Sequence, residues 1–226
     1  MILIEAAVAS QSEAESAGAA GADRLELCEQ LEVGGVTPSV ALFESIRVAV
    51  PVWVLIRPRA GNFIYTEAEF AQLKHDAAWF LDHGASGIVT GILNADGAVD
   101  ALRSAEVARL ATGRITFHRA FDETPDPLAA LEAVIDCGYR RILTSGGAAT
   151  AIDGVAEIAA LVCAARGRIE ILPGGGVSPA NALDLIRRTG CTQLHGSFRC
   201  GASTTDAARI RELKKLLSSA VARGWS

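Results

Sequence analysis

Residues 115–144 read ITFHRAFDETPDPLAALEAVIDCGYRRILT, and this stretch contains one complete repeat of the fold. The apolar, β-branched run at 115–117 predicts a strand, and the apolar spacing over 127–137 predicts a helix. Gly138 follows that helix, at the position where a left-handed residue commonly ends one. A second apolar run at 141–144 predicts the next strand. The stretch therefore predicts a strand, a helix and a strand in that order.

The same alternation recurs along the whole chain. The strand candidates are residues 2–7, 24–28, 52–57, 87–90, 114–118, 141–144, 169–173 and 193–196. The helix candidates between and after them are residues 12–20, 39–48, 66–83, 101–110, 127–137, 154–165, 179–188 and 205–222. Before the seventh of these helices, Ser178 and Pro179 read as an N-cap followed by a proline at the first helical position.

Strict alternation of strand and helix predicts a parallel sheet. Eight such units in 226 residues fit a closed (β/α)₈ TIM barrel, which would make residues 1–226 a single domain. A doubly wound open sheet is the alternative. It is less favoured because no GxGxxG turn follows the first strand.

Composition and charge exclude several classes of function. The net charge is −5 and the basic residues are scattered, so no basic face for nucleic acid is expected. The start of the chain lacks the basic segment of a signal peptide, and no apolar run approaches the ~20 residues of a membrane span. The five cysteines are Cys28, Cys137, Cys163, Cys191 and Cys200. They form no CxxC pair and no zinc-like spacing. Their odd number and their scatter along the chain argue against a disulfide framework and favour a reducing compartment. We therefore expect a cytoplasmic protein with neither nucleic acid nor membrane as a partner.

Several strands carry polar residues on the face opposite the apolar one. Because strand residues alternate between faces, we expect Glu5, Glu26, Arg57 and His118 to converge inside the barrel near the carboxyl ends of the strands. Barrel active sites lie there. Cys28 shares the face of Glu26 and is the one cysteine expected to face the interior. Burying an unpaired charge costs several kcal/mol. These residues therefore form either a functional site or a self-satisfied ion-pair network, and both interpretations stay open.

Three arginines follow predicted strand ends and suit an anionic ligand. Arg57 and Arg59 flank a proline in a glycine-containing loop, and Arg119 follows the fifth strand. A guanidinium group grips carboxylate or phosphate with two parallel hydrogen bonds. Asp122, three residues after Arg119, is placed to orient that arginine or His118. The alternative is an ordinary ion pair that fixes the loop.

The loops after the last two strands are rich in glycine. Gly175 and Gly176 follow the seventh strand, while His195, Gly196 and Ser197 end the eighth. Phosphate-binding barrels hold phosphate on backbone N–H groups at this place. The alternative is that a tight turn simply requires glycine.

These residue types support proton transfer next to a carbonyl, as in an isomerase or a lyase. In that hypothesis Glu26 or Glu5 is the general base and His118 is the general acid or electrophile. Thr144, at the end of the sixth strand, joins the arginines and the late glycine loops in holding the substrate. No lysine stands at a strand end, which argues against a Schiff-base aldolase. A divalent ion on the two carboxylates and a non-catalytic binding barrel are further alternatives.

Six segments in order resemble the CutC family. They are RLELC (24–28), GGVTPS (34–39), IRPRAGNF (56–63), VTG (89–91), TFHRAFD (116–122) and LTSG (143–146). The resemblance runs from Glu5 to about Ser197. It implies a cytoplasmic TIM-barrel protein, commonly a homodimer or a higher homo-oligomer. It also implies a link to copper homeostasis, with copper(I) as the proposed bound metal.

Copper(I) prefers thiolate and thioether ligands. Members of the family proposed to bind copper carry cysteines at the end of the first strand, where this chain has Glu5-Ala6-Ala7-Val8 and no thiol. Cys28 is therefore the remaining candidate metal ligand. Two functions follow from the sequence, which are copper(I) handling and an enzyme acting on a small anionic, potentially phosphorylated, substrate.

Overall fold

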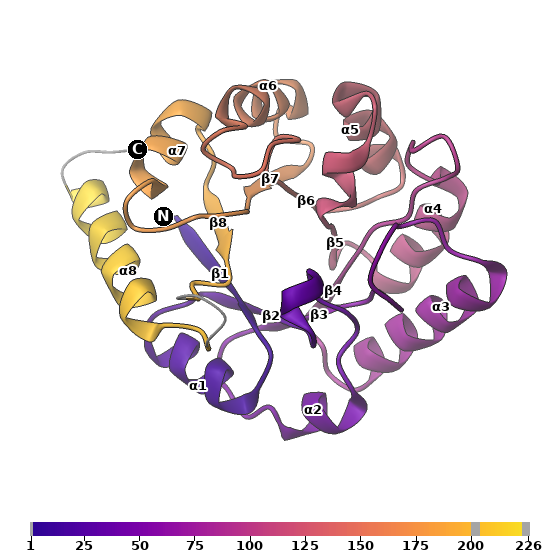
Figure 1. Cartoon of the computed structure of the whole chain (residues 1–226), viewed down its shortest axis with the longest axis horizontal. Coiled ribbons are helices and arrows are strands. Elements are labelled where there is room, and N and C mark those ends of the chain that lie inside the picture. The colour runs from indigo at the N-terminus through magenta and orange to yellow at the C-terminus, as the bar shows by residue number, and fades with distance from the viewer. Residues whose placement is uncertain (1, 200–203, 223–226) are drawn as a thin grey trace.

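The computed structural model describes residues 2–199 and 204–222, so Cys200 lies outside the described residues. The strands are β1 (Leu3–Val8), β2 (Arg24–Leu27), β3 (Val52–Leu55), β4 (Gly87–Thr90), β5 (Ile115–Phe117), β6 (Arg141–Thr144), β7 (Glu170–Pro173) and β8 (Gln193–Gly196). All pairings described between them are parallel, and the sheet order is β7-β6-β5-β4-β3-β2-β1-β8. Because β8 pairs with β1 and comes to lie near β7, the sheet curls into a nearly closed barrel (Figure 1). The predicted TIM barrel is confirmed.

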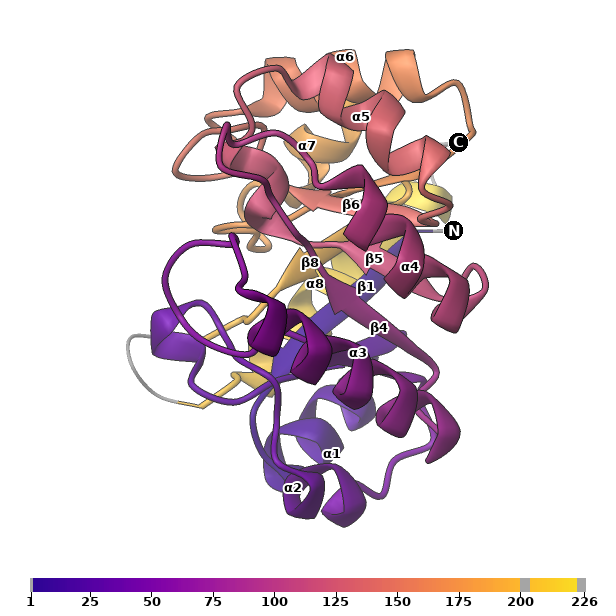
Figure 2. The same ribbon diagram turned by 90° about the vertical axis from the view of Figure 1, so that its right-hand side faces the viewer.

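Helices surround the strands. They are α1 (Gln11–Ala19), α2 (Val40–Ser45), α3 (Glu67–Asp82), α4 (Ala101–Ala111), α5 (Pro127–Asp136), α6 (Val155–Ala165), α7 (Ala182–Thr189) and α8 (Ala207–Ala222), with short 3₁₀ helices η1 (Leu31–Val33) and η2 (Arg119–Glu123). Figure 2 shows α1 and α2 on one side of the strands and α5 and α6 on the other. Among the described residues, no helix combines the length and the apolar character needed to cross a membrane.

The helix boundaries follow from local capping. Thr66 and Glu69 form a reciprocal capping box at the start of α3. Asp126 accepts two backbone N–H groups at the start of α5, and Pro127 occupies the first helical position. Gly138 has a φ of 88° and its N–H donates to Ile135, which ends α5. Residues 115–144 therefore fold as their sequence predicts.

Several predicted boundaries differ from the structure, and the helix expected at 39–48, for example, ends at Ser45. Two of the differences arise because a side chain takes over a backbone bond. The helix expected at 179–188 begins at Ala182, since the side chain of Asn181 accepts the N–H of Ser178 at 2.9 Å and closes a turn instead. Ser178 is therefore not the N-cap. The strand expected at 52–57 ends at Leu55, and the N–H of Arg57 donates to the Thr37 hydroxyl at 2.8 Å. Arg57 consequently begins a loop.

The predicted alternation of faces is confirmed in β2. Leu25 and Leu27 pack outward in the core between sheet and helices, while Cys28 packs with Trp53, Leu55 and Val89 inside the barrel. The barrel interior therefore has its own small apolar cluster, separate from the main core.

An ion-pair network fills the amino-terminal half of the barrel interior. The buried Arg24 pairs with Glu5 and donates to Gln193 at 2.9 Å. Arg141 donates to the same Gln193 oxygen at 3.0 Å and pairs with Glu170 at 3.1 Å. Both guanidinium groups also lie over the Trp53 ring. This network lies below the carboxyl ends of the strands and shares only Glu5 with the set considered from the sequence, since Arg57 and His118 are not part of it.

Candidate active site

A cavity of about 360 Å³ opens where the carboxyl ends of the strands meet. The sequence-predicted residues that line it are Glu26, Cys28, Arg57, His118, Arg119, Gly175, Gly176, His195, Gly196 and Ser197. These residues come from β2, β3, β5, β7 and β8 or from the loops that follow them. The barrel therefore brings most of the predicted site together, at the end where barrel active sites are found.

The imidazole of His195 lies between two carboxylates. Its Nδ1 is 2.8 Å from Oε1 of Glu5, and its Nε2 is 3.4 Å from Oε2 of Glu26. The register explains the arrangement, because Glu5 of β1 pairs with both Arg24 of β2 and His195 of β8. Glu26 lies one inward-facing position further along β2. His195 thus connects the buried network with the cavity.

The two carboxylates have opposite electrostatic environments. Burial raises the pKa of Glu26 to about 7, and the nearby Glu5 adds to the effect against the pull of His195. Burial also acts on Glu5, but Arg24 and His195 outweigh it and lower its pKa to about 2. Burial opposes the charged form of His195, yet Glu26 and Glu5 raise its pKa. Glu26 can therefore gain or lose a proton near neutral pH, as a general base or acid must.

His118 is a neutral hydrogen-bond donor. Its Nδ1 accepts the N–H of Ala120 at 3.1 Å, which places the ring proton on Nε2. That Nε2 is buried and has no hydrogen-bond partner among the described residues. Burial, assisted by the charge of Arg57, lowers the pKa of His118 to about 3. His118 lines the cavity and therefore brings a buried N–H without a partner close to it.

Two neighbours fix the ring of His118. The Phe63 ring lies 4.8 Å away between centroids, in a tilted arrangement. Gly91 approaches from β4, where a Cβ atom would lie only 2.6 Å from Nδ1 of His118. The segment 89–91 that supported the family resemblance thus has a physical reason for ending in glycine.

Arg57 is held by loop backbone rather than by an acid. Its Nη1 donates to the carbonyl oxygens of Val33 and Gly35 at 3.2 and 3.0 Å, and its Nη2 donates to Gly61 at 2.8 Å. Its guanidinium also lies over the Phe63 ring. The Nε atom is buried without a partner in the described chain. Arg57 therefore contributes an uncompensated positive charge to the cavity.

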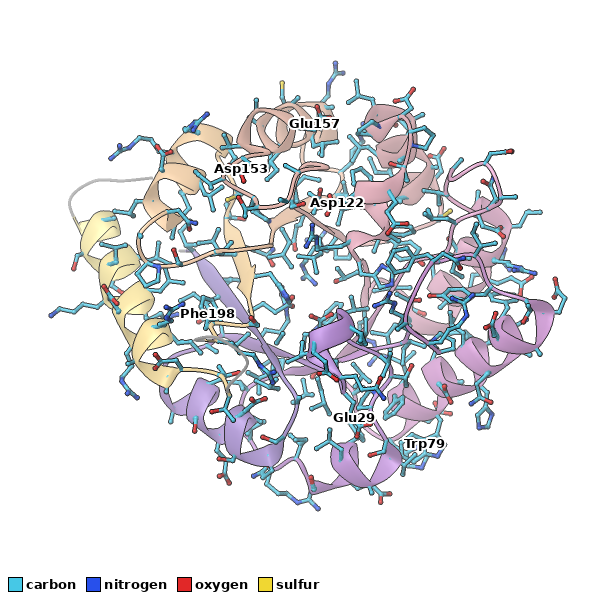
Figure 3. All side chains as sticks on the ribbon, in the orientation of Figure 1. Glu29, Trp79, Asp122, Asp153, Glu157 and Phe198 are labelled. Carbon is cyan, nitrogen blue, oxygen red and sulfur yellow. The ribbon has the colours of Figure 1, made fainter. Side chains whose placement is uncertain are left out.

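Asp122 acts on Arg119. Its Oδ2 receives the Nε–H of Arg119 at 2.7 Å, and its carboxylate also accepts the backbone N–H groups of Ser145 and Gly147. Thr144 donates its hydroxyl to Asp122 as well. Figure 3 shows Asp122 on the side of the barrel mouth that faces α5 and α6. Asp122 and Thr144 thus position Arg119 from outside the lining of the cavity.

Two other predicted residues also lie away from the cavity lining. Glu5 lies beneath His195 and reaches the cavity only through that ring. Arg59 pairs with Glu69 at 2.6 Å and donates to the carbonyl oxygens of Asn62 and Ile64. Arg59 was expected to contact the substrate, but its side chain is engaged by these partners and does not line the cavity. Arg59 instead folds its own loop against the start of α3.

One wall of the cavity, formed by residues after β8, was not predicted from the sequence. Phe198 and Arg199 line it, and Figure 3 shows Phe198 on the side facing α8. Arg199 pairs with Glu13 of α1 at 2.9 Å. The available signal was an arginine two residues after Ser197, the same kind of loop position that identified Arg119.

The donor atoms fit copper(I) poorly. The one group of three whose donor atoms lie within 4.8 Å of one another, among the described residues, is Glu5, Glu26 and His195. Carboxylate and imidazole suit harder divalent ions, whereas copper(I) needs sulfur. Both oxygens of Glu5 are already bound, to Arg24 and to His195. Cys28 is the one thiol lining the cavity in the described chain, and burial raises its pKa well above the usual range.

Fold and cavity together define a (β/α)₈-barrel protein with a polar site at the carboxyl ends of its strands. The family profile of CutC matches residues 2–200, and the chain belongs to the CutC family.

Known relatives agree with that assignment. The chain is 40% identical over 229 residues to the human copper homeostasis protein cutC homolog, covering 99% of this chain and 80% of that protein. It is 43% identical over 197 residues to a family protein CutC from Treponema denticola, covering 86% of this chain and 80% of the relative. The crystal structure of CutC from Streptococcus agalactiae superposes with a TM-score of 0.81 at 32% identity, covering 87% of this chain and 99% of that one.

Proposed function

We propose that the cavity is the active site of an enzyme that moves a proton on a small anionic substrate, as an isomerase or a lyase does. The observation that carries this proposal is the buried, unpartnered Nε2–H of neutral His118, a residue that lines the same cavity as the Glu26–His195 pair. A buried donor without a partner costs about 1–3 kcal/mol. A substrate oxygen that accepts this N–H would remove that cost.

The residues divide the proton transfer between them. The Glu26 carboxylate accepts a proton from the carbon beside a carbonyl group, and the C–H electron pair forms the enolate double bond. The charge that develops on the carbonyl oxygen is stabilised by the Nε2–H of His118. In an isomerase the α-carbon carries a hydroxyl group. Glu26 returns its proton to the former carbonyl carbon, the hydroxyl proton passes to the former carbonyl oxygen, and the α-carbon becomes the new carbonyl. In a lyase the enolate instead expels a leaving group from the β-carbon.

The positive charges in the cavity favour an anionic substrate. Arg57 and Arg119 line the cavity, and Glu26 is the one carboxylate that does so within the described chain. His195, whose pKa is raised, holds the carboxylate of Glu26 in place through Nε2. The site therefore combines a base of suitable pKa, a neutral electrophile and an attraction for anions.

Copper(I) handling is the second candidate function. It is supported by the name of the human relative and by the thiol of Cys28 in the cavity. A single thiolate with imidazole nearby would leave copper(I) with too few soft ligands.

The free cysteines, Cys28, Cys137, Cys163 and Cys191, support a cytoplasmic location. A homodimer or larger oligomer stays a prediction.

A thermal-shift screen of small keto acids and sugar phosphates tests the proposal. We expect at least one compound to raise the melting temperature of the wild type. His118→Ala should weaken that effect, because it removes the donor to the carbonyl oxygen. The Glu26→Gln variant should still bind the compound. It should not catalyse exchange of the compound's α-proton for deuterium in D₂O, because the base is missing. If no compound stabilises the wild type, the proposal loses its basis.

A further inference from the structure

One wall of the cavity consists of donors without partners. The backbone N–H groups of Gly175, Gly176 and Ser197 have no hydrogen-bond partner within the described residues. The hydroxyls of Ser178 and Ser197 make no hydrogen bond there either. All four residues line the cavity, on the side formed by the loops after β7 and β8. Such a concentration of free donors is suited to an anion.

Arg119 completes this wall. Its Nε and Nη2 are bound by Asp122 and Ser145, each at 2.7 Å, while its Nη1 has no partner in the described chain. The position of a Cβ on Gly175 would be 3.4 Å from that Nη1, so the free nitrogen lies directly beside the β7 loop. The bonds to Asp122 and Ser145 fix the guanidinium, so a ligand need not order it.

The glycines allow the β7 loop to approach this closely. A Cβ at Gly174 would lie 2.5 Å from the Leu143 side chain and 3.2 Å from the His195 ring. Gly175 has a φ of 98°, which an L-residue with a side chain rarely adopts. The glycines thus bring backbone donors next to both Arg119 and His195.

We propose that this wall binds a phosphate group and that the substrate is a phosphate monoester. The inference rests on the proposed function and narrows its substrate class. One guanidinium nitrogen, three backbone N–H groups and two hydroxyls exceed what the two oxygens of a carboxylate can accept. They suit the three terminal oxygens of a phosphate. Glu26, the one carboxylate lining the cavity in the described chain, comes from β2 rather than from these loops. The phosphate anchors one end of the substrate and leaves the carbonyl end for Glu26 and His118.

Calorimetric titration with inorganic phosphate tests the subsite in the whole protein. We expect the wild type to bind it and Arg119→Gln to weaken binding about tenfold or more, as expected for a lost charge-assisted hydrogen bond. Arg168→Gln is the matched control. Arg168 also pairs with a carboxylate, and its side chain is 42% exposed against 43% for Arg119. It precedes β7, at the far end of the barrel. Equal affinities of the wild type and Arg119→Gln would overturn the proposal.

Amide NMR locates the ion independently of any variant's stability. On addition of phosphate to the wild type, we expect the largest shifts at the amides of Gly175, Gly176 and Ser197. Shifts concentrated elsewhere would contradict the subsite.

The subsite and the enzyme can fail separately. A phosphorylated carbonyl compound whose α-proton exchanges equally well in the wild type and in Arg119→Gln would overturn the subsite and leave the enzyme standing. Phosphate that binds at the glycine amides, with no α-proton exchange in any phosphorylated carbonyl compound, would support the subsite and overturn the proton-transfer function.

Discussion

Nδ1 of His195 lies 2.8 Å from Oε1 of Glu5, and this contact joins the cavity to the ion-pair network beneath it. The second oxygen of Glu5 binds Arg24, so both ends of the carboxylate are held. A carboxylate that accepts the Nδ1–H of a histidine fixes the orientation of the ring. Nε2 is therefore directed towards Glu26. Glu5 is a positioning residue, which acts on the site through His195.

Replacing Glu5 should cost both stability and the charge state of His195. Glu5→Gln leaves Arg24 buried without its counter-ion, which typically costs about 3–5 kcal/mol. It also removes a negative charge from His195, so the pKa of His195 should fall. Urea denaturation and an NMR pH titration of the His195 ring measure the two effects.

Glu15→Gln is the control for that variant. Glu15 is an exposed residue of α1 whose carboxylate accepts a hydrogen bond from the side chain of Gln11. Its replacement should change the free energy of unfolding by no more than ~0.5 kcal/mol. Equal stabilities of the two variants, with an unchanged His195 titration, would contradict the role given to Glu5.

His118 should make the protein less stable as the pH falls. The pKa of His118 is about 3 in the folded protein, against 6.5 ordinarily, so below pH 6.5 the unfolded chain binds a proton that the native state does not. The stability from this group is complete above pH 6.5 and is lost towards acid, by up to about 1.4 kcal/mol per pH unit. Relative to His118→Gln, the wild type should lose stability between pH 6.5 and 4.5. Parallel profiles of the two proteins in urea denaturation would contradict a neutral, buried His118.

Gly91 should be required for the position of His118. In Gly91→Ala the new methyl group would lie 2.6 Å from Nδ1 of the ring, so the ring must move or the strand must shift. Such overpacking costs about 1–3 kcal/mol, and the Nε2–H would lose its place in the cavity. We expect reduced stability and weaker binding of any ligand found in the thermal-shift screen.

Gly18→Ala serves as the comparison. Gly18 lies in α1, and a Cβ there meets its nearest atom at an ordinary 3.5 Å. The helix should gain up to ~1 kcal/mol from alanine. If Gly91→Ala behaves like Gly18→Ala, the steric account of His118 is wrong.

Copper(I) should not be retained tightly at the cavity. In competition with a copper(I) chelator, Cys28→Ser should hold as much metal as the wild type, because Cys28 is the one sulfur ligand lining the cavity in the described chain. Cys163→Ser, which changes an exposed thiol, is the control. One equivalent of copper that is retained by the wild type and lost specifically in Cys28→Ser would instead favour the copper function.

The sequence predicted the barrel because each strand–helix unit carries its own local signals. The apolar strand at 115–117, the apolar helical spacing at 127–137 and Gly138 suffice for one unit, and similar signals repeat around the barrel. Boundaries failed where a side chain competes with the backbone, as at Asn181. Such competition depends on three-dimensional distances that local patterns do not contain.

The sequence predicted most of the residues that make up the candidate site, but not which of them contact one another. Alternation of faces placed Glu26 and His118 in the cavity. It could not show that His195 lies between Glu5 and Glu26, because that contact depends on how β8 pairs with β1. It also could not separate Arg57, whose charge reaches the cavity, from Arg59, which binds Glu69.

The most direct test of the proposed proton transfer is deuterium exchange at the carbon beside the carbonyl group of a bound anion, followed by ¹H NMR in D₂O. We expect the wild type and Glu15→Gln to exchange this proton at equal rates, while Glu26→Gln binds the compound without exchange. Exchange by Glu26→Gln at the wild-type rate would contradict the assignment of the base. No exchange by the wild type in any compound that binds would contradict the proposed function itself.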